Sequence, residues 1–214
     1  MSRASPIEEL AHVDVPPFNH NITIRNPQWL MYRSIVPDKT CDAIVELALK
    51  LPATQGTIFN SSRVNDPGRV STAIRQSQVR WVNRNDPQFA KLLAFTDKVV
   101  RTVNQGFQVN CDTVNSLQFT EYPVGGYYNW HHDINWNRND GRARKISFVI
   151  QLSAPDQYTG GDLEFKDHEN PVREHLREKG TMICFMPYQM HRVTPLESGT
   201  RYSLVGWYEG PKWA

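Results

Sequence analysis

The chain has 214 residues, of which 39% are hydrophobic, and this is enough for one ordinary domain with a sizeable buried core. Its 24 Lys and Arg residues nearly balance 22 Asp and Glu residues, so no strong field attracts nucleic acid or an anionic membrane. The sequence predicts neither a membrane-spanning stretch nor an export signal, and three widely spaced cysteines indicate a reducing compartment. We therefore expect a single-domain cytoplasmic protein, monomeric or weakly dimeric, that binds neither nucleic acid nor membrane.

The first half of the chain predicts two helices and one strand. Residues 1–28 hold four prolines and few periodic apolar positions, which indicates an extended, loosely packed N-terminal segment. An amphipathic run after Pro37 predicts a helix over 38–51, and alternation over 73–82 predicts a strand. A second helix is expected from Asp86-Pro87 to Gly106. We interpret residues 29–109 as a supporting region for the rest of the domain.

The second half of the chain, residues 110–214, is typical of a β domain. Short apolar or alternating segments are separated by Gly, Pro, Asn and Asp at intervals of about ten residues, as in all-β sandwiches and barrels. We expect a mostly β fold in which a jelly-roll catalytic core is supported on one face by the N-terminal helices. The predicted strands are residues 113–122, 127–133, 145–153, 161–166, 171–175, 180–185, 190–194 and 201–209.

Three side chains in this half form a candidate metal site. His131 and Asp133 stand two residues apart on a predicted strand, where alternate side chains point to the same face. His132 between them should point to the opposite face and is not expected to be a ligand. His191 begins another predicted strand and supplies a second imidazole. Two histidines and one carboxylate form the facial triad of non-haem Fe(II) oxygenases, which leaves metal positions open.

Arg201 strengthens this interpretation, because an HxD pair by itself is weak evidence. Arg201 follows His191 by ten residues, and a turn at 197–199 would return it alongside His191 and into the same cavity. The planar guanidinium binds a carboxylate through two parallel hydrogen bonds. We expect Arg201 to hold the distal carboxylate of 2-oxoglutarate, whose other end would chelate the iron.

With these residues in place, about half of the chain resembles the prolyl 4-hydroxylase-like family of Fe(II)- and 2-oxoglutarate-dependent dioxygenases, including the bacterial PKHD-type hydroxylases. The resemblance implies a double-stranded β-helix core and hydroxylation coupled to decarboxylation of 2-oxoglutarate to succinate and carbon dioxide. Fe(II), 2-oxoglutarate and dioxygen are the implied cofactors. The matching blocks are residues 122–133, 144–153, 160–165 and 180–185, followed by His191, Arg201 and Trp207.

The same resemblance implies roles for three more residues. Tyr122 would hydrogen-bond the oxoacid, Gln151 would line the site on a core strand, and Trp207 would form part of the pocket wall. Gln151 departs from the family pattern, since many relatives have tyrosine there. The implied substrate is a prolyl residue in a peptide or protein. A free amino acid or another small molecule is the alternative substrate, and a non-catalytic jelly-roll binding module is the alternative function.

Several neighbouring residues allow two interpretations. The polar loop 135–144 follows the HxD pair and is either a solvated connection or a substrate-binding lid, with Trp136 as its exposed lid residue. Arg75 and Ser77 face the same side of the predicted strand and either reach the cleft or pair with neighbours. A cupin-like metal isomerase or hydrolase would need an additional general base, for which the sequence offers no clear candidate.

Overall fold

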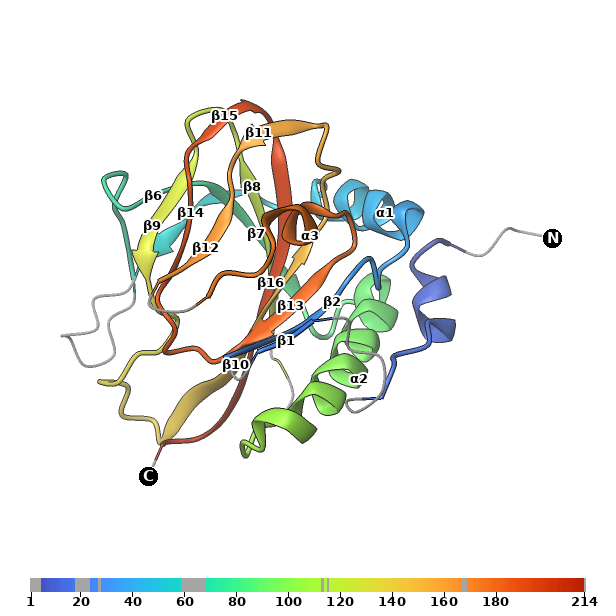
Figure 1. Cartoon of the computed structure of the whole chain (residues 1–214), viewed down its shortest axis with the longest axis vertical. Helices are drawn as coiled ribbons and strands as arrows, with labels where there is room; N and C mark the ends of the chain where they lie inside the picture. Colours follow the sequence, from blue (N-terminus) through green and yellow to red (C-terminus); the bar gives the residue numbers. More distant parts are fainter. Residues whose placement is uncertain are drawn as a thin grey trace.

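In the computed structural model, residues 5–17, 24–26, 28–58, 68–112, 114, 116–166 and 169–213 are described. Their largest element is an eight-stranded antiparallel sheet (Figure 1). Its central strands are the long β10 and β16, which pair along nearly their whole length. The strand order is β1 (Ile24–Asn26), β2 (Trp29–Tyr32), β13 (Met182–Phe185), β10 (Arg142–Gln151), β16 (Arg201–Pro211), β8 (Ser116–Tyr122), β7 (Gln78–Asn83) and β3 (Thr54–Gln55).

A smaller four-stranded sheet faces the large one and completes the jelly roll. Its strands are antiparallel and short. Two strand pairs extend this framework. The smaller sheet runs β12 (Leu163–Phe165), β14 (His191–Val193), β9 (Tyr127–His131) and β6 (Arg75–Gln76), and the pairs are β11 (Tyr158–Gly160) with β15 (Leu196–Gly199) and β4 (Thr57–Ile58) with β5 (Arg69–Val70).

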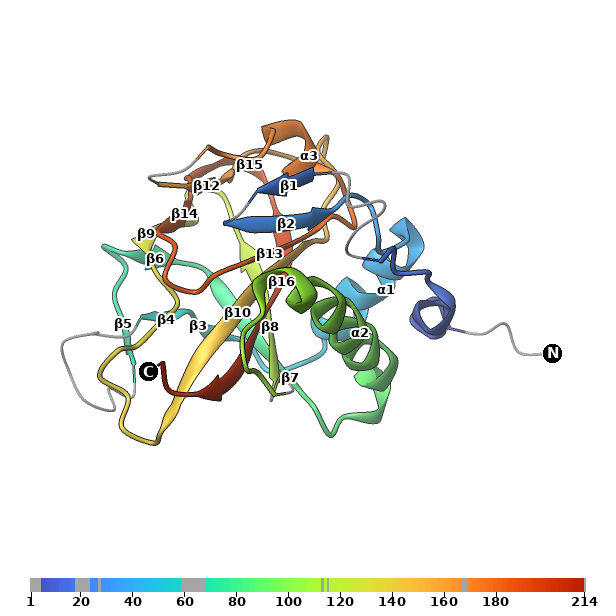
Figure 2. The same cartoon turned by 60° about the horizontal axis from the view of Figure 1, so that its bottom comes forward.

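Two long helices cover the outer face of the larger sheet, as predicted (Figure 2). They are α1 (Asp38–Ala48) and α2 (Ala90–Phe107), the second preceded by a 3-10 turn at Pro87–Phe89. Both helices are amphipathic, and their apolar faces bury residues against the sheet in the main hydrophobic core. That core also includes Phe119 and Phe148 of the sheet. The helices therefore close one face of the sheet and leave the other free to face the smaller sheet.

The N-terminal segment departs from the expected loose packing. Residues Glu8–His12 form a 3-10 helix, η1, rather than an extended stretch. Ile7, Leu10 and Val15 are buried in the main core, where η1 packs against α2. Apolar burial of this kind stabilises a segment even when its sequence lacks helical periodicity. The expectation of an extended, loosely packed start was therefore wrong for these residues.

The predicted strand at 171–175 was also wrong. Residues Arg173–Arg177 form a single helical turn, α3, in which the consecutive residues Leu176 and Arg177 are both buried. Arg177 donates hydrogen bonds to three backbone carbonyls and to Asp162. These tertiary contacts hold the helical turn in place.

The predicted strand at 73–82 divides into two strands that belong to different sheets. Arg75–Gln76 pairs with β9 in the smaller sheet, whereas Gln78–Asn83 pairs with β8 in the larger one. Ser77 lies between them and joins neither ladder. This segment therefore crosses from one sheet to the other and lines one side of the space between them. None of the helices formed by the described residues is long and apolar enough to cross a membrane.

Candidate active site

Two neighbouring strands of the smaller sheet bring the three predicted ligands together. His131 is the last residue of β9 and His191 the first of β14, and the two are directly paired in register. Asp133 follows β9, and its backbone N–H donates to Pro187 O at 2.8 Å. The Asp133 carboxylate oxygens lie 3.9 Å from His131 Nε2 and 3.8 Å from His191 Nε2. The three ligand atoms lie within 4.8 Å of one another, a spacing that fits one metal ion.

Backbone carbonyls orient both imidazoles. His131 Nδ1 lies 2.8 Å from Asn129 O, and His191 Nδ1 lies 2.9 Å from Gln189 O. Because a carbonyl only accepts, each Nδ1 carries the hydrogen and each Nε2 presents its lone pair toward Asp133. Hydrogen bonds of this type fix the tautomer and ring orientation of metal-binding histidines. The ring of Tyr128 stacks on His131 with centroids 3.4 Å apart and restricts it further.

Asp133 is held as a carboxylate by its neighbours. Ser147 Oγ donates to Asp133 Oδ2 at 2.7 Å, and Arg144 Nη1 donates to the backbone oxygen of Asp133 at 3.0 Å. Burial by itself raises the pKa of Asp133, but the two histidines, Arg144 and the Ser147 hydroxyl together lower it to about 2. The carboxylate is therefore ionised at neutral pH and available as a ligand.

The imidazole of His131 favours its neutral, metal-binding form. Burial, together with the nearby His191, lowers the pKa of His131 well below its ordinary value of 6.5, despite the opposing effect of Asp133. A neutral imidazole is the form that binds metals. The protein therefore presents one anionic and at least one neutral ligand without having to release a proton from either at neutral pH.

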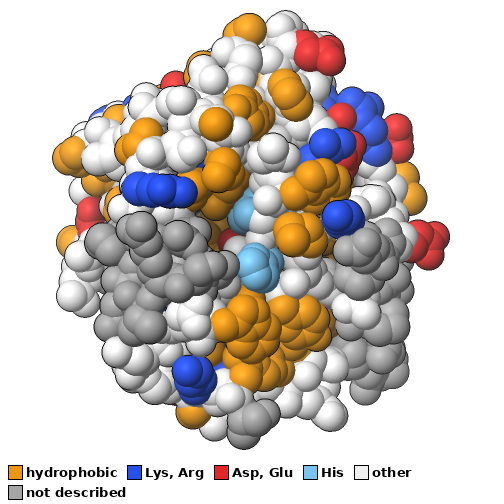
Figure 3. Space-filling model, turned by 90° about the vertical axis from the view of Figure 1, so that its left-hand side faces the viewer, with side chains coloured by type: hydrophobic (Ala, Val, Ile, Leu, Met, Phe, Trp, Pro, Cys, Tyr) orange, Lys and Arg blue, Asp and Glu red, His pale blue; other side chains and the backbone are white. Residues whose placement is uncertain are grey.

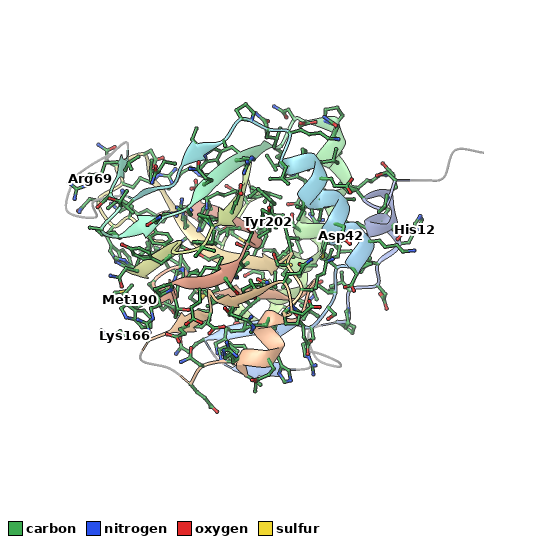
Figure 4. The ribbon with its side chains drawn as sticks, turned by 90° about the horizontal axis from the view of Figure 1, so that it is seen from above. His12, Asp42, Arg69, Lys166, Met190 and Tyr202 are labelled. Atoms are coloured by element: carbon green, nitrogen blue, oxygen red, sulfur yellow. The ribbon has the colours of Figure 1, made fainter. Side chains whose placement is uncertain are left out.

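These ligands line a cavity of about 610 Å³ between the two sheets. In Figure 3, which shows the left-hand side of Figure 1, histidine side chains lie in a hollow bordered by hydrophobic side chains. Met190, which also lines the cavity, lies at the end of the molecule away from His12 and Asp42 (Figure 4). The cavity thus opens on the side opposite the helices, and its volume is typical of a small-molecule or cofactor site.

Arg201 lines this cavity from the larger sheet and faces the metal ligands of the smaller one. Its side chain is buried at 3% exposure, yet Nη1 has no hydrogen-bond partner among the described residues. An unpaired buried cation is costly, so the site favours an anion at this point. Tyr122 is paired in register with Arg201, and burial raises the pKa of its hydroxyl, which keeps it protonated and able to donate.

The predicted route from His191 to Arg201 was wrong, although both residues line one cavity as predicted. Residues Leu196–Gly199 form strand β15, which pairs with β11, instead of a turn that returns Arg201 beside His191. Arg201 then begins β16 in the larger sheet. The two residues consequently come from different sheets, since the chain crosses the jelly roll between them.

The other predicted site residues differ in whether they line the cavity. Trp207 lines the cavity, and its indole Nε1 is buried without a partner among the described residues. Gln151 is absent from the described lining, and its amide donates to Ser153 O and to Tyr158 Oη, both at 2.9 Å. Its contact with the oxoacid stays a prediction. His132 was expected to point to the face opposite the two ligands, but it also lines the cavity, outside the cluster of His131, Asp133 and His191.

The loop after the HxD pair is more structured than a solvated connection. Trp136 is exposed at 48%, in line with its prediction as an exposed loop residue, but Arg138 forms ion pairs with both Asp140 and Glu209. Strand β10 already begins within the predicted loop. Asn135, Arg138 and Asp140 line the cavity, so the loop forms part of its wall.

Sequence reasoning missed two residues beside the metal ligands, Ser147 and Arg144. Ser147 is a lone hydroxyl in an otherwise apolar buried strand segment, and that contrast is the signal that could have found it. Arg144 was interpreted as a loop residue, whereas its guanidinium lies over the Trp207 ring at 3.9 Å and reaches Asp133. No sequence pattern by itself indicates that contact.

Comparison with known proteins agrees with this geometry. Residues 117–209 match the family model of the 2OG-Fe(II) oxygenase superfamily. A PKHD-type hydroxylase from a Synechococcus species is 38% identical over 96 residues, which is 45% of this chain and 42% of that protein. Several further PKHD-type hydroxylases are covered over 43% of their length, so these matches span less than half of each relative.

One relative matches over a longer region. A PKHD-type hydroxylase of Synechococcus elongatus is 35% identical over 177 residues, 79% of this chain and 77% of that protein. Among solved structures, a Trichoplax adhaerens prolyl hydroxylase in complex with a peptide fragment of hypoxia inducible factor superposes with a TM-score of 0.66 and 16% identity. That superposition covers 95% of this chain and 87% of the other, and it supports the jelly-roll fold. The chain therefore belongs to the 2OG-Fe(II) oxygenase superfamily, among relatives of the PKHD type.

Proposed function

We propose that the protein is an Fe(II)- and 2-oxoglutarate-dependent dioxygenase that hydroxylates its substrate. The observation that carries this proposal is a buried guanidinium, Arg201, whose Nη1 has no partner among the described residues and which lines the same cavity as three clustered metal ligands. His131, Asp133 and His191 would hold the iron, and Arg201 would bind the distal carboxylate of 2-oxoglutarate. A dicarboxylic oxoacid that spans from metal to guanidinium satisfies both features.

When bound, iron and 2-oxoglutarate supply the oxidising chemistry that inserts an oxygen atom of dioxygen into a C–H bond and leaves succinate and carbon dioxide. The chain's own residues orient and shield these groups. Asn129 O and Gln189 O keep the two imidazoles in their metal-binding tautomer, and Ser147 holds the Asp133 carboxylate. The low pKa of Asp133 keeps a negative charge beside the cation across the physiological pH range.

Three further residues are proposed to bind or border the oxoacid. Tyr122, paired in register with Arg201, would donate its phenolic hydrogen to the same carboxylate. Trp207 would form part of the wall, since its ring lies in the cavity beneath Arg144. Gln151 would act indirectly, through its hydrogen bond to Tyr158, which belongs to the same buried cluster as Tyr122.

A prolyl residue in a peptide or protein is the proposed substrate. The cavity is open to one face of the molecule and is lined by aromatic side chains, among them Trp81, Trp130 and Tyr128, which suit an apolar ring. The structural relative from Trichoplax adhaerens is a prolyl hydroxylase with a bound peptide, which supports a peptide substrate. A free amino acid is the alternative that the same cavity volume admits.

The remaining proposals concern the state of the protein in the cell. Cys41, Cys111 and Cys184 are all free thiols, which supports a reducing, cytoplasmic location. Strands from the supporting region 29–109 and from the core 110–214 share one sheet, which supports a single domain. We propose that the protein is a monomer or weak dimer.

An anaerobic titration of the metal-free protein with Fe(II) and 2-oxoglutarate tests the proposed cofactors. The expected result is the weak visible absorption of a chelated Fe(II)–oxoacid complex, lost in His191→Ala. Succinate formation in air would then be measured with and without prolyl peptides. Absence of the band in folded, metal-loaded protein would contradict the proposal and favour a non-catalytic jelly-roll module.

A further inference from the structure

A second buried arginine lines the cavity and is not used by the proposed reaction. Arg75 lies on β6 at the edge of the smaller sheet, and its side chain is exposed at only 4%. Its Nε donates to Ser77 Oγ at 2.8 Å, and its Nη1 donates to Thr57 O at 3.2 Å. Its Cζ lies 4.6 Å from the ring centroid of Tyr128, the same ring that stacks on His131. Arg75 therefore contacts the cavity within one side chain of a proposed metal ligand.

Arg75 has no carboxylate partner among the described residues, unlike three other arginines that are similarly buried or line the same cavity. Arg177 is exposed at 8% and pairs with Asp162 at 2.8 Å. Of the other arginines that line the described cavity, Arg138 pairs with Glu209, and Arg144 lies 3.9 Å from an oxygen of Asp133. Within the described part of the chain, Arg75 therefore shares with Arg201 the condition of a buried cation without an anion, which is unfavourable unless a ligand supplies the charge.

The guanidinium of Arg75 is held in a fixed position. A Cβ atom at Gly56 would lie 2.4 Å from Arg75 Nε and 2.6 Å from Ser77 Oγ, so the absence of a side chain there makes room for the guanidinium. The Gly56 N–H also donates to Ser77 O at 2.9 Å, which holds this turn against the arginine. A donor fixed in this way binds an anion without losing much side-chain entropy. Such rigidity is typical of a recognition site.

We propose that Arg75 binds a carboxylate carried by the substrate. This inference rests on the proposed function, in which Arg201 takes the distal carboxylate of 2-oxoglutarate and leaves Arg75 for a second anion. The planar fork of arginine matches a carboxylate better than a neutral amide, because the hydrogen bonds are then charge-assisted. The carboxylate is either an acidic side chain beside the hydroxylated residue of a peptide or the α-carboxylate of a free amino acid. The substrate is thus an acidic molecule in either case.

The test follows the arginine Nε–Hε signals by NMR in the full chain loaded with Zn(II), which is redox-inert, and saturated with 2-oxoglutarate. The Arg75 signal is identified by its loss in Arg75→Lys. Acetate is the first probe, and we expect a saturable shift of the Arg75 signal. The Arg177 signal should stay unmoved, because that guanidinium is already fully engaged. An unmoved Arg75 signal would overturn the proposal.

Matched acid and amide probes then identify the source of the carboxylate through the same signal. L-proline is compared with L-prolinamide, and N-acetyl-Asp-Pro-amide with N-acetyl-Asn-Pro-amide. We expect the acid of one pair to bind about ten- to a hundredfold more tightly than its amide, which is the effect of one charge-assisted contact. A preference within the first pair indicates a free amino acid, and one within the second pair indicates an acidic peptide. Equal binding within both pairs would contradict the proposal.

Arg75→Gln separates this proposal from the function on which it rests. The variant should abolish the preference for the acid over the amide, measured as the affinity of each probe for the 2-oxoglutarate-loaded protein. Its affinity for 2-oxoglutarate itself should stay within twofold of the parent value, since Arg201 is intact. A large loss of 2-oxoglutarate affinity in Arg75→Gln would mean that Arg75 serves the oxoacid and would refute a substrate site. If the Fe(II)–oxoacid absorption is absent while acetate still shifts the Arg75 signal, the proposed function fails and the anion site stands.

Discussion

Replacing Arg201 with methionine should affect stability and 2-oxoglutarate binding in opposite directions. Arg201 is buried at 3% exposure, its Nη1 has no partner among the described residues, and its Cζ lies 5.6 Å from the Tyr122 ring centroid. A methionine keeps most of the apolar stem and removes the buried charge. The metal-free protein should therefore lose little stability, or gain about 1 kcal/mol, because an uncompensated cation leaves the interior.

The loss of oxoacid affinity should be large. A bidentate arginine–carboxylate contact contains two charge-assisted hydrogen bonds, each with a net contribution of about 1.5–3 kcal/mol. Since the carboxylate of the oxoacid would stay buried without its partner, we expect roughly 3–4 kcal/mol to be lost, or about a hundred- to a thousandfold in the dissociation constant. Metal affinity should stay near that of the parent protein, because the triad lies on the opposite sheet.

Arg177→Met is the matched control. Arg177 is similarly buried but donates to Asp162, Gly160 O, Pro155 O and Tyr158 O. Its removal deprives three carbonyls of this donor and leaves Asp162 with Arg173 as its remaining arginine partner. We expect a loss of about 3–5 kcal/mol in the free energy of unfolding, since each buried acceptor that loses its donor costs about 1–3 kcal/mol. Urea denaturation of both metal-free variants and calorimetric titration with 2-oxoglutarate give the comparison. If Arg201→Met destabilises the protein as much as Arg177→Met and leaves oxoacid affinity intact, Arg201 is structural and the reasoning fails.

Three further predictions test the site. Ser147→Ala removes a hydrogen bond to the Asp133 carboxylate and should weaken Fe(II) binding about 10- to 100-fold, measured by competition with a chelator. An unchanged Fe(II) affinity would contradict the proposal that Ser147 orients Asp133. Gly161→Ala places a Cβ 2.6 Å from Leu196 Cδ1 and 3.2 Å from Arg201 Cδ at a φ of +64°, so it should destabilise the protein by about 1–3 kcal/mol and raise the dissociation constant of 2-oxoglutarate. If the free energy of unfolding and the dissociation constant of 2-oxoglutarate both equal the parent values, the backbone at Gly161 relaxes without cost and the prediction is wrong. Burial, assisted by a nearby histidine, lowers the pKa of His131. Below pH 6.5 the unfolded chain therefore binds a proton that the folded metal-free protein does not, and the free energy of unfolding decreases as the pH is lowered. About 1.4 kcal/mol should be lost by pH 5.5, and a steep decline that persists in His131→Asn would exclude this residue as its source.

The clustering of the three candidate metal ligands was predictable because their spacing reflects local geometry. An HxD pair at the end of a strand puts two side chains near one point, and the register of β9 with β14 then pairs His131 with His191. The amphipathic helices and most strands of the second half followed from apolar periodicity for the same reason. The family resemblance added the hydroxylation coupled to decarboxylation of 2-oxoglutarate and the prolyl substrate, which periodicity does not specify.

Features that depend on contacts between distant segments were not predictable. The turn α3 is helical because Arg177 reaches carbonyls and a carboxylate that lie 15 to 22 residues earlier in the chain. Strand β2 is a short apolar run with no periodic signal, and it forms because β13 offers an edge to pair with. In both cases the interaction that decides the local conformation comes from elsewhere in the chain.

The sequence by itself determined which side chains could bind iron and a carboxylate, since these are properties of residue type and short-range spacing. The fold decides that Arg201 faces the ligands from the opposite sheet, that Gln151 donates to Tyr158, and that Arg75 is buried with no carboxylate partner among the described residues. The physical reason is that charge compensation and burial depend on every segment packed around a group. The charge of each arginine is known from the sequence, but only the fold shows which buried arginines have no carboxylate partner among the described residues.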